Sequence, residues 1–340
     1  MLKLPYLRYL CNHISLLKIT NSIKYAVYIA NQSVVPNLLT TAVMSTDLDI
    51  AKCCEFAKKL TLQAGEIIKC SFESEKTLYK KTKDDWDLAT DIDHKVEKML
   101  IDNLSKEFPD HKIVAEETVF MMKKEPELTD APTWFIDPID GTLNFIHGFP
   151  MFCISIGLLV GKEPVLGIIY NPITSELYSA IKGGGAFLNG KRIYTSKVTE
   201  LEKSVQLFEP KIIQVMQEKN KDIFIARMIA IIEATEIMRH LGSAALSMAY
   251  VARGAAHCIH IDYLQSWDIA AGLVIISEAG GTIIETKGGV YNIMKPNIIA
   301  ASNETLARKM SKLVIETDLE VERKWLEDQT RCKKETDHVK

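Results

Sequence analysis

The sequence lacks several features that mark whole classes of protein. Its formal net charge is only −3, so it has no broad basic field of the kind that nucleic-acid-binding proteins use. No apolar run is long enough to cross a bilayer as a helix. The seven cysteines are scattered and lack the spacing of a zinc site, which indicates free thiols in a reducing compartment. We therefore expect a cytoplasmic protein that binds neither nucleic acid nor a membrane.

The first part of the chain lacks acidic residues. Residues 1–46 contain no Asp or Glu, although Lys and Arg are present. Such a composition is typical of a mitochondrial transit peptide, which would place the mature protein in mitochondria if residues 1–43 are removed. The single arginine and the many leucines fit that interpretation poorly. We favour the alternative, that this N-terminal extension comes from the gene model and that Met44 is the working start.

What the sequence does contain is enough apolar material for a large core, since 47% of its 340 residues are hydrophobic. Helical periodicity predicts helices over residues 47–72, 91–108, 224–233, 243–253 and 267–278, and from 303 onward. Short apolar runs predict strands at 111–115, 134–136, 152–159, 165–170, 176–181 and 298–301. This mixture favours a layered α/β fold over a plain Rossmann alternation. The charged C-terminal tail, 317–340, is expected to be a solvated helix or disordered.

Acidic residues gather where predicted buried strands end. Glu116 and Glu117 follow one strand, Asp137 and Asp140 follow the next, and Asp268 stands at the start of a helix. A lone acid at such a place is usually a helix cap. Two acids at one strand end need another explanation, because like charges at about 4 Å repel by roughly 1 to 4 kcal/mol. Mg²⁺, a hard cation that prefers oxygen ligands, would offset this repulsion.

The residues after this pair indicate phosphate chemistry. Gly141 lets the backbone turn and expose its N–H groups, and residues 142–147 are expected to form a helical turn. A helix N-terminus beside a metal is a ready phosphate site. The Thr142 hydroxyl can hold or polarise a water. The residues alone therefore predict metal-assisted hydrolysis of a phosphate ester.

The same region carries a family resemblance. Residues 134–150, WFIDPIDGTLNFIHGFP, resemble the first signature of the inositol monophosphatase family, and residues 267–272 resemble the second. Other segments resemble further family motifs, with small departures: 87–91 (shorter than the family's Asp-Leu-Val-Thr-x-x-Asp), 115–118, 183–190 and 241–245. The resemblance covers about residues 47–316, which we take as the catalytic domain.

The resemblance implies a fold, a cofactor and a reaction. The family fold is an αβαβα five-layered sandwich, usually a homodimer. Its enzymes use two or three Mg²⁺ per site, and many are inhibited by Li⁺. The implied reaction is the hydrolysis of inositol monophosphate by in-line displacement with a metal-activated water, without a phospho-enzyme. That reaction belongs to inositol phosphate metabolism and phosphatidylinositol signalling.

The resemblance also implies roles for individual residues. The implied metal ligands are Glu116, Asp137, the carbonyl of Ile139, Asp140 and Asp268. The implied catalytic residues are Glu116, Thr142 and Asp137. The implied substrate contacts are Asp140, Gly141, Thr142, Gly242, Ser243, Ala244 and Asp268. The implied mobile metal loop and its surroundings contain Lys80, Asp85 and Asp91.

Two segments depart from the family pattern on the alcohol side. The family usually has a Glu that reaches inositol hydroxyls at the position of Ile261. Asp262 could substitute only if a bulge redirected it, because a shift of one residue along a strand turns the side chain to the other face. The segment 206–211 replaces a Gly-Ser-Ser-Arg-like turn. Hydrolysis is thus better supported than inositol specificity. The alternatives are a phosphatase of another sugar phosphate or of a nucleotide 3′-phosphate, and a non-catalytic, metal-binding regulatory relative.

Overall fold

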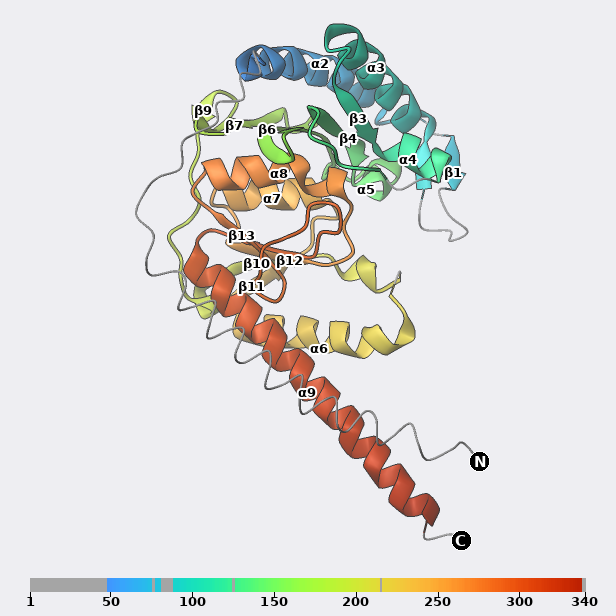
Figure 1. The fold of residues 1–340 in the computed structure, drawn as a ribbon, viewed down its shortest axis with the longest axis vertical. Coiled ribbons are helices and arrows are strands. Elements are labelled where there is room, and N and C mark those ends of the chain that lie inside the picture. The colour runs from blue at the N-terminus through green and yellow to red at the C-terminus, as the bar shows by residue number, and fades with distance from the viewer. Residues whose placement is uncertain (1–47, 75–76, 81–87, 124–125, 215, 338–340) are drawn as a thin grey trace. The chain divides into compact units, whose positions relative to one another are not determined.

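The computed structural model describes residues 48–74, 77–80, 88–123, 126–214 and 216–337 (Figure 1). The chain from Asp49 onward forms one compact unit. The N-terminal extension, residues 1–46, lies outside the described residues. Within the described part, no helix has the length and apolar character needed to cross a membrane.

The larger sheet carries the strands that lead to the carboxylates. Its order is β3-β4-β5-β6-β7-β8-β9; β3 and β4 are parallel, and the other neighbours are antiparallel. The strands are β3 (Lys112–Ala115), β4 (Thr133–Asp140), β5 (Cys153–Val160), β6 (Glu163–Asn171), β7 (Glu176–Ile181), β8 (Gly185–Leu188) and β9 (Lys191–Arg192). The helices α2 (Ile50–Ser71) and α3 (Asp91–Glu107) cover one face of this sheet (Figure 1).

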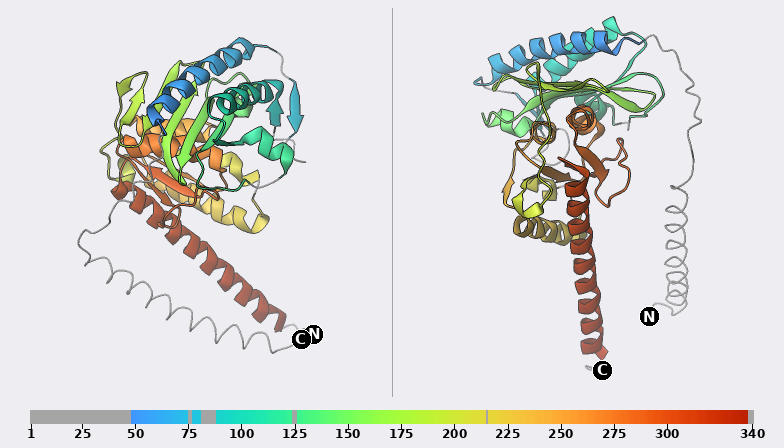
Figure 2. Two further views of the ribbon diagram at one scale, coloured as in Figure 1. Left: turned by 45° about the horizontal axis from the view of Figure 1, so that its top comes forward. Right: turned by 90° about the vertical axis from the view of Figure 1, so that its left-hand side faces the viewer.

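Two central helices, α7 (Ala244–Ala252) and α8 (Ser266–Glu278), cover the other face of the larger sheet. They separate it from a second sheet, of order β11-β10-β12-β14-β13 (Figure 2). Its strands are β10 (Val205–Phe208), β11 (Ile237–Arg239), β12 (Cys258–Ile261), β13 (Thr282–Glu285) and β14 (Ile298–Ala301). The two helices are apolar on nearly every side because each is enclosed between two sheets.

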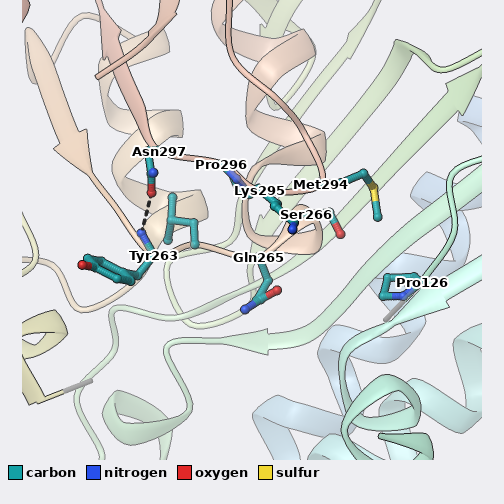
Figure 3. A pocket seen from close by; sticks show the side chains of 9 residues that line it. Pro126, Tyr263, Gln265, Ser266, Met294, Lys295, Pro296 and Asn297 are labelled. Carbon is teal, nitrogen blue, oxygen red and sulfur yellow. Dashed lines mark hydrogen bonds between the residues drawn. The ribbon is translucent and has the colours of Figure 1, made fainter. Parts of the chain in front are cut away.

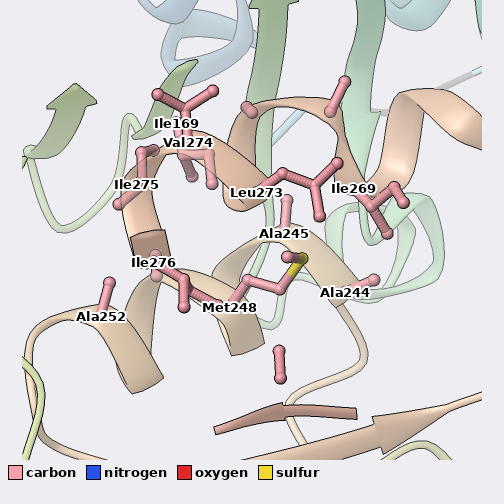
Figure 4. Packing of buried hydrophobic residues seen from close by; sticks show 14 of the residues in the cluster. Ile169, Ala244, Ala245, Met248, Ala252, Ile269, Leu273, Val274, Ile275 and Ile276 are labelled. Carbon is pink, nitrogen blue, oxygen red and sulfur yellow. The ribbon is translucent and has the colours of Figure 1, made fainter. Parts of the chain in front are cut away.

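Close packing fixes the central helices. Met248 of α7 lies in one buried cluster with Leu273 and Ile276 of α8 (Figure 4). Gly167 of β6 lets α8 approach the sheet, because a Cβ there would collide with the backbone of Ala271. The N-terminus of each central helix is thereby held at the edge where β4 ends.

An outer layer completes the fold. The helices α6 (Glu218–Ala234) and α9 (Glu304–Asp337) pack on each other, and α9 contacts the second sheet. The layers therefore follow the order α, β, α, β, α, and the five-layered sandwich is confirmed. Shorter elements are β1 (Leu78–Lys80), β2 (Leu88–Thr90), α4 (Glu116–Met122), α5 (Thr142–Ile146) and two 3₁₀ turns, Leu201–Lys203 and Pro210–Gln214.

The start of the expected C-terminal tail is part of the outer layer. The helix α9 runs through residue 316 without a break. Asp318 is buried, and its carboxylate accepts two hydrogen bonds of 2.6 Å from Arg227 of α6. The expected boundary between residues 316 and 317 thus falls inside a helix, because a buried ion pair holds that helix beyond it. The tail is expected to be a solvated helix or disordered; it is helical through Asp337, but at Asp318 the helix is buried and not solvated.

Candidate active site

The end of β4 brings two carboxylates to one side. In a regular strand, residues three apart face opposite ways. Here Asp137 pairs with Ser155 of β5 whereas Asp140 pairs with Cys153, so the ladder is irregular between them. The negative charge of Asp140 raises the pKa of Asp137, which places both groups in one electrostatic environment.

Four acids meet around Asp137. This side chain is only 2% exposed, and burial raises its pKa well above the usual range. The charges of Glu116, Asp140 and Asp268 raise it further, and Glu116 also shares a hydrogen bond with it. The structure thus brings together the four carboxylates that the sequence predicts as metal ligands. They come from the ends of β4 and the starts of α4 and α8.

Glu116 is positioned by a residue that the sequence reasoning missed. The helix α4 begins at Glu116, directly after Ala115, which cannot cap it. Glu97, a buried residue of α3, accepts hydrogen bonds from the N–H groups of Glu117 at 2.7 Å and Thr118 at 2.8 Å. Burial raises the pKa of Glu97, against the effect of these hydrogen bonds. A carboxylate from another helix therefore caps α4 and fixes the backbone at Glu116.

Asp140 is held by the N-terminus of α7. Its Oδ2 atom accepts hydrogen bonds from the Ser243 hydroxyl and the Ala245 N–H, each 2.6 Å long. The Ala244 N–H lies 3.4 Å from Oδ1. Burial raises the pKa of Asp140 to about 6, although the Ser243 and Ala245 hydrogen bonds lower it. The predicted substrate segment, residues 242–244, is therefore next to the carboxylates.

Two glycines allow that close approach. Gly141 has a φ of +96°, and a Cβ on it would lie 3.0 Å from the Gly242 carbonyl oxygen. Gly242 has a φ of +73° and packs against Asn144. The Asn144 amide donates to the carbonyls of Met151 at 2.5 Å and Leu241 at 2.7 Å. The turn at Gly141, which is predicted to bind phosphate, is thus fixed next to Gly242, which is predicted to contact the alcohol.

The Thr142 hydroxyl lies between two oxygens. It is 3.0 Å from the Ile139 carbonyl oxygen and 3.4 Å from Oδ1 of Asp93. Asp93 is buried in the first turn of α3, where its other oxygen accepts from the Thr90 N–H at 2.8 Å. Asp93 therefore orients the hydroxyl that the sequence predicts to act on water.

The place of Asp91 in the mobile metal loop or its surroundings stays a prediction, because its contact lies at the foot of that loop. Asp91 is exposed at the start of α3, and its carboxylate accepts from the Thr77 N–H at 3.1 Å. Asp93, on the inner side of the same turn, is the acid of this turn that reaches Thr142. Asp85 lies outside the described residues, and only the backbone of Lys80, at the end of β1, is described.

Asp268 sits in the first turn of α8. Its Oδ2 atom accepts from the Gln265 N–H at 2.7 Å, which caps the helix. A cavity of about 350 Å³ borders this turn. Figure 3 shows it between Gln265 and the loop that contains Lys295, with the hydrogen bond from the Tyr263 N–H to Asn297 at its rim.

The donor set suits a hard cation. All side-chain ligands that the sequence predicts are carboxylates, which Mg²⁺ prefers. Across the described ranges, no three His, Cys, Asp or Glu side chains form a ready-made metal site. The charges of Glu116, Asp140 and Asp268 nevertheless raise the pKa of Asp137, so these three carboxylates lie within electrostatic reach of it. Each carboxylate has about four lone-pair sites, so Asp140 and Asp268 keep capacity for an ion beside their protein donors.

The alcohol side has changed. Ile261 is buried in the core between the sheets. Asp262 does not replace the missing acid, because it forms a 2.6 Å ion pair with Arg227 and accepts a 2.6 Å hydrogen bond from Thr286. Burial raises the pKa of Asp262, but His260 lowers it more than any other neighbour, and Thr286 and Arg227 lower it further, so the net shift is downward.

Comparisons with known proteins agree with this geometry. The model of the inositol monophosphatase family matches residues 49–317. Inositol monophosphatase 1 of Bos taurus is 37% identical over 267 residues, which span 77% of this chain and 93% of that protein. Inositol monophosphatase 2 of Mus musculus is 39% identical over 260 residues, or 75% and 87% of the two chains. The structure of Thermotoga maritima IMPase has a TM-score of 0.69 at 32% identity, covering 79% of this chain and 99% of that one.

Proposed function

The chain belongs to the inositol monophosphatase family, and from this premise we propose that it hydrolyses inositol monophosphate to inositol and phosphate with Mg²⁺. Relatives that carry the name inositol monophosphatase match it over three quarters of its length. The observation that carries the proposal is the set of four carboxylates around Asp137, a buried group whose pKa is raised by its neighbours. Burying several carboxylates without a counter-charge is unfavourable, because they lose hydration and repel one another. A divalent cation beside them would supply that counter-charge.

Glu116, Asp137, Asp140 and Asp268, with the Ile139 carbonyl, would hold the metal ions. When bound, Mg²⁺ would supply the positive charge that activates a water and stabilises the leaving alkoxide. Glu116, which lies beside Asp137, would accept the proton of that water. Thr142, oriented by Asp93, would hold the water in line with the phosphorus.

The backbone would bind the phosphate. Gly141 and Thr142 stand at the start of α5, and the left-handed turn at Gly141 directs the chain into that helix. Ser243 and Ala244 lie next to the carboxylates, because the Ser243 hydroxyl and the Ala244 N–H donate to Asp140. The alcohol part of the substrate would lie beside these two residues.

The test is phosphate release by the purified chain with and without Mg²⁺. Substrates are inositol 1-phosphate, a hexose phosphate and adenosine 3′,5′-bisphosphate. We expect Mg²⁺-dependent turnover that is fastest on inositol 1-phosphate. Absence of turnover on every substrate would favour the non-catalytic regulatory relative.

A second candidate has one observation in its favour. Neither Ile261 nor Asp262 offers a carboxylate to the alcohol, so the usual recognition of inositol is altered. Faster turnover of the hexose phosphate or the adenosine bisphosphate would identify the chain as a phosphatase of that class.

Membership of the family leads us to propose two further properties. We propose a homodimer, which sedimentation of the purified chain would detect. We also propose inhibition by Li⁺, measured as loss of Mg²⁺-dependent phosphate release.

A further inference from the structure

A carboxylate–imidazole pair stands next to the predicted alcohol side. Glu209 follows β10, and its Oε2 atom lies 2.8 Å from Nδ1 of His240. The same nitrogen lies 3.3 Å from the Phe208 carbonyl oxygen. Because both neighbours are acceptors, Nδ1 must carry the proton. The ring is thereby held in one orientation, with Nε2 on its other side.

The pair is anchored to the active-site segment. Oε1 of Glu209 accepts from the Gly242 N–H at 3.3 Å and from the Ser247 hydroxyl at 3.4 Å. The charge of Glu209 also contributes to the raised pKa of Asp140. Glu209 therefore lies within electrostatic reach of the carboxylates, and His240 stands two residues before Gly242.

The outer nitrogen of His240 is available to a ligand. Among the described residues it has no recorded hydrogen-bond partner, and the side chain is 47% exposed. The hydrogen bond that His240 donates to Glu209 raises the pKa of His240, so the charged ring is favoured. A charged ring donates from Nε2, whereas a neutral ring with its proton on Nδ1 accepts there. A hydroxyl group can pair with either form, because it both donates and accepts.

We propose that His240, positioned by Glu209, binds a hydroxyl group of the substrate's polyol through Nε2. It would take over the recognition that the buried Ile261 cannot provide. This inference rests on the proposed polyol phosphatase activity. It also gives the altered 206–211 segment a role, because Glu209 of that segment would hold His240 in the orientation that binds the hydroxyl group.

The experiment compares two substrates in the full chain. Inositol 1-phosphate carries ring hydroxyls, and 4-nitrophenyl phosphate carries none. We expect His240→Ala to raise KM for inositol 1-phosphate by about threefold to tenfold, the worth of one hydrogen bond, with kcat changed little. KM for 4-nitrophenyl phosphate should stay the same. Glu209→Gln should act in the same direction, since it removes the charge that holds the ring.

A neighbouring residue supplies the control. Arg239 is exposed at the end of β11, directly before His240, and its guanidinium donates to the Met238 carbonyl. Arg239→Ala should change neither KM. Equal effects of His240→Ala on both substrates, or no effect on either, would overturn the inference.

A second readout separates this inference from the proposed function. The ring resonances of His240 should shift when inositol 1-phosphate is titrated into the wild-type chain, even if no turnover is measured. A wild-type chain that turns over inositol 1-phosphate but whose His240 signals stay unchanged would contradict only the present inference. No turnover combined with a shift would contradict only the proposed catalysis.

Discussion

Two aspartates in one helical turn show how single residues are assigned to the site. Asp91 and Asp93 both open α3, yet only Asp93 is buried and reaches Thr142. The difference is helical phase, because residues two apart project about 200° from each other around a helix. The family pattern Asp-Leu-Val-Thr-x-x-Asp, placed on residues 87–93, also ends at Asp93, so the sequence held a signal for this residue that the expectation of Asp91 overlooked.

We predict that Asp93→Asn and Asp91→Asn have unequal effects. The Asp93 variant should lose about tenfold to a hundredfold in kcat, because a carboxylate that orients a residue of the site is altered. The Asp91 variant should keep near-normal kcat, since its exposed carboxylate accepts from the Thr77 N–H, just before β1. Steady-state kinetics of both variants measures this. Equal losses would contradict the assignment.

The grouping of four acids could be predicted because Glu116, Asp137 and Asp140 stand where strands end and Asp268 stands where a helix begins. Glu97 and Glu209 could not be, since each acts across long sequence separations. Glu97 caps α4 from a helix 20 residues earlier, and Glu209 reaches Gly242 at a separation of 33 residues. Such contacts arise only when the layers pack, and no local pattern indicates them.

At the scale of elements, the strands with partners in a hairpin were the most predictable. The bounds expected for β7 and β14 are those observed. The strands β10, β11, β12 and β13 were not predicted. Each is only three or four residues long, and β12 is buried on both faces, so it lacks the alternation that marks a strand. These short strands are stabilised by the helical layers that cover both faces of the second sheet.

The capping of α4 gives a prediction at this scale. Glu97→Gln replaces a charged acceptor of two backbone N–H groups with a neutral one. We expect a loss of about 1 to 2 kcal/mol in the free energy of unfolding and weaker Mg²⁺ binding, because Glu116 is less firmly placed. Denaturant unfolding and calorimetric Mg²⁺ titration test the two effects. An unfolding loss with unchanged Mg²⁺ affinity would contradict the link to the site.

At the scale of the whole molecule, an ion-pair network joins distant parts of the fold. Arg227 of α6 binds Asp318 of α9 and Asp262, which follows β12. Asp262 stands at the start of the loop that leads to α8 and Asp268. The C-terminal helix is therefore connected, through buried charges, to the segment that carries a predicted metal ligand.

We predict that Asp318→Ala lowers the free energy of unfolding by about 3 kcal/mol, because it leaves part of a buried charge uncompensated. Glu320, on the same helix, pairs with Lys324 at 2.8 Å on the surface. Glu320→Ala should give no measurable change. Urea unfolding gives the free energy of unfolding of both variants. Equal values for the two variants would show that the ion-pair network contributes little to stability.

The cluster of carboxylates has a consequence for the stability of the metal-free protein. The pKa of Asp140 is about 6 in the folded chain, against 3.8 for an unperturbed aspartate. Its protonation therefore stabilises the fold fully below about pH 4, and this contribution is lost as the pH rises through 6. Asp137, with its strongly raised pKa, acts in the same direction. A bound cation should offset this loss of stability at higher pH, because it favours the ionised form of both aspartates.

Thermal unfolding from pH 4.5 to pH 8, with and without Mg²⁺, tests the central claim that these carboxylates form a metal site. The account predicts that Mg²⁺ raises Tm of the wild-type chain much more at pH 8 than at pH 4.5. It also predicts that the Asp137→Asn variant is folded, inactive and little stabilised by Mg²⁺ at either pH. A Mg²⁺ effect of the same size at all pH values, or in the variant, would contradict the claim.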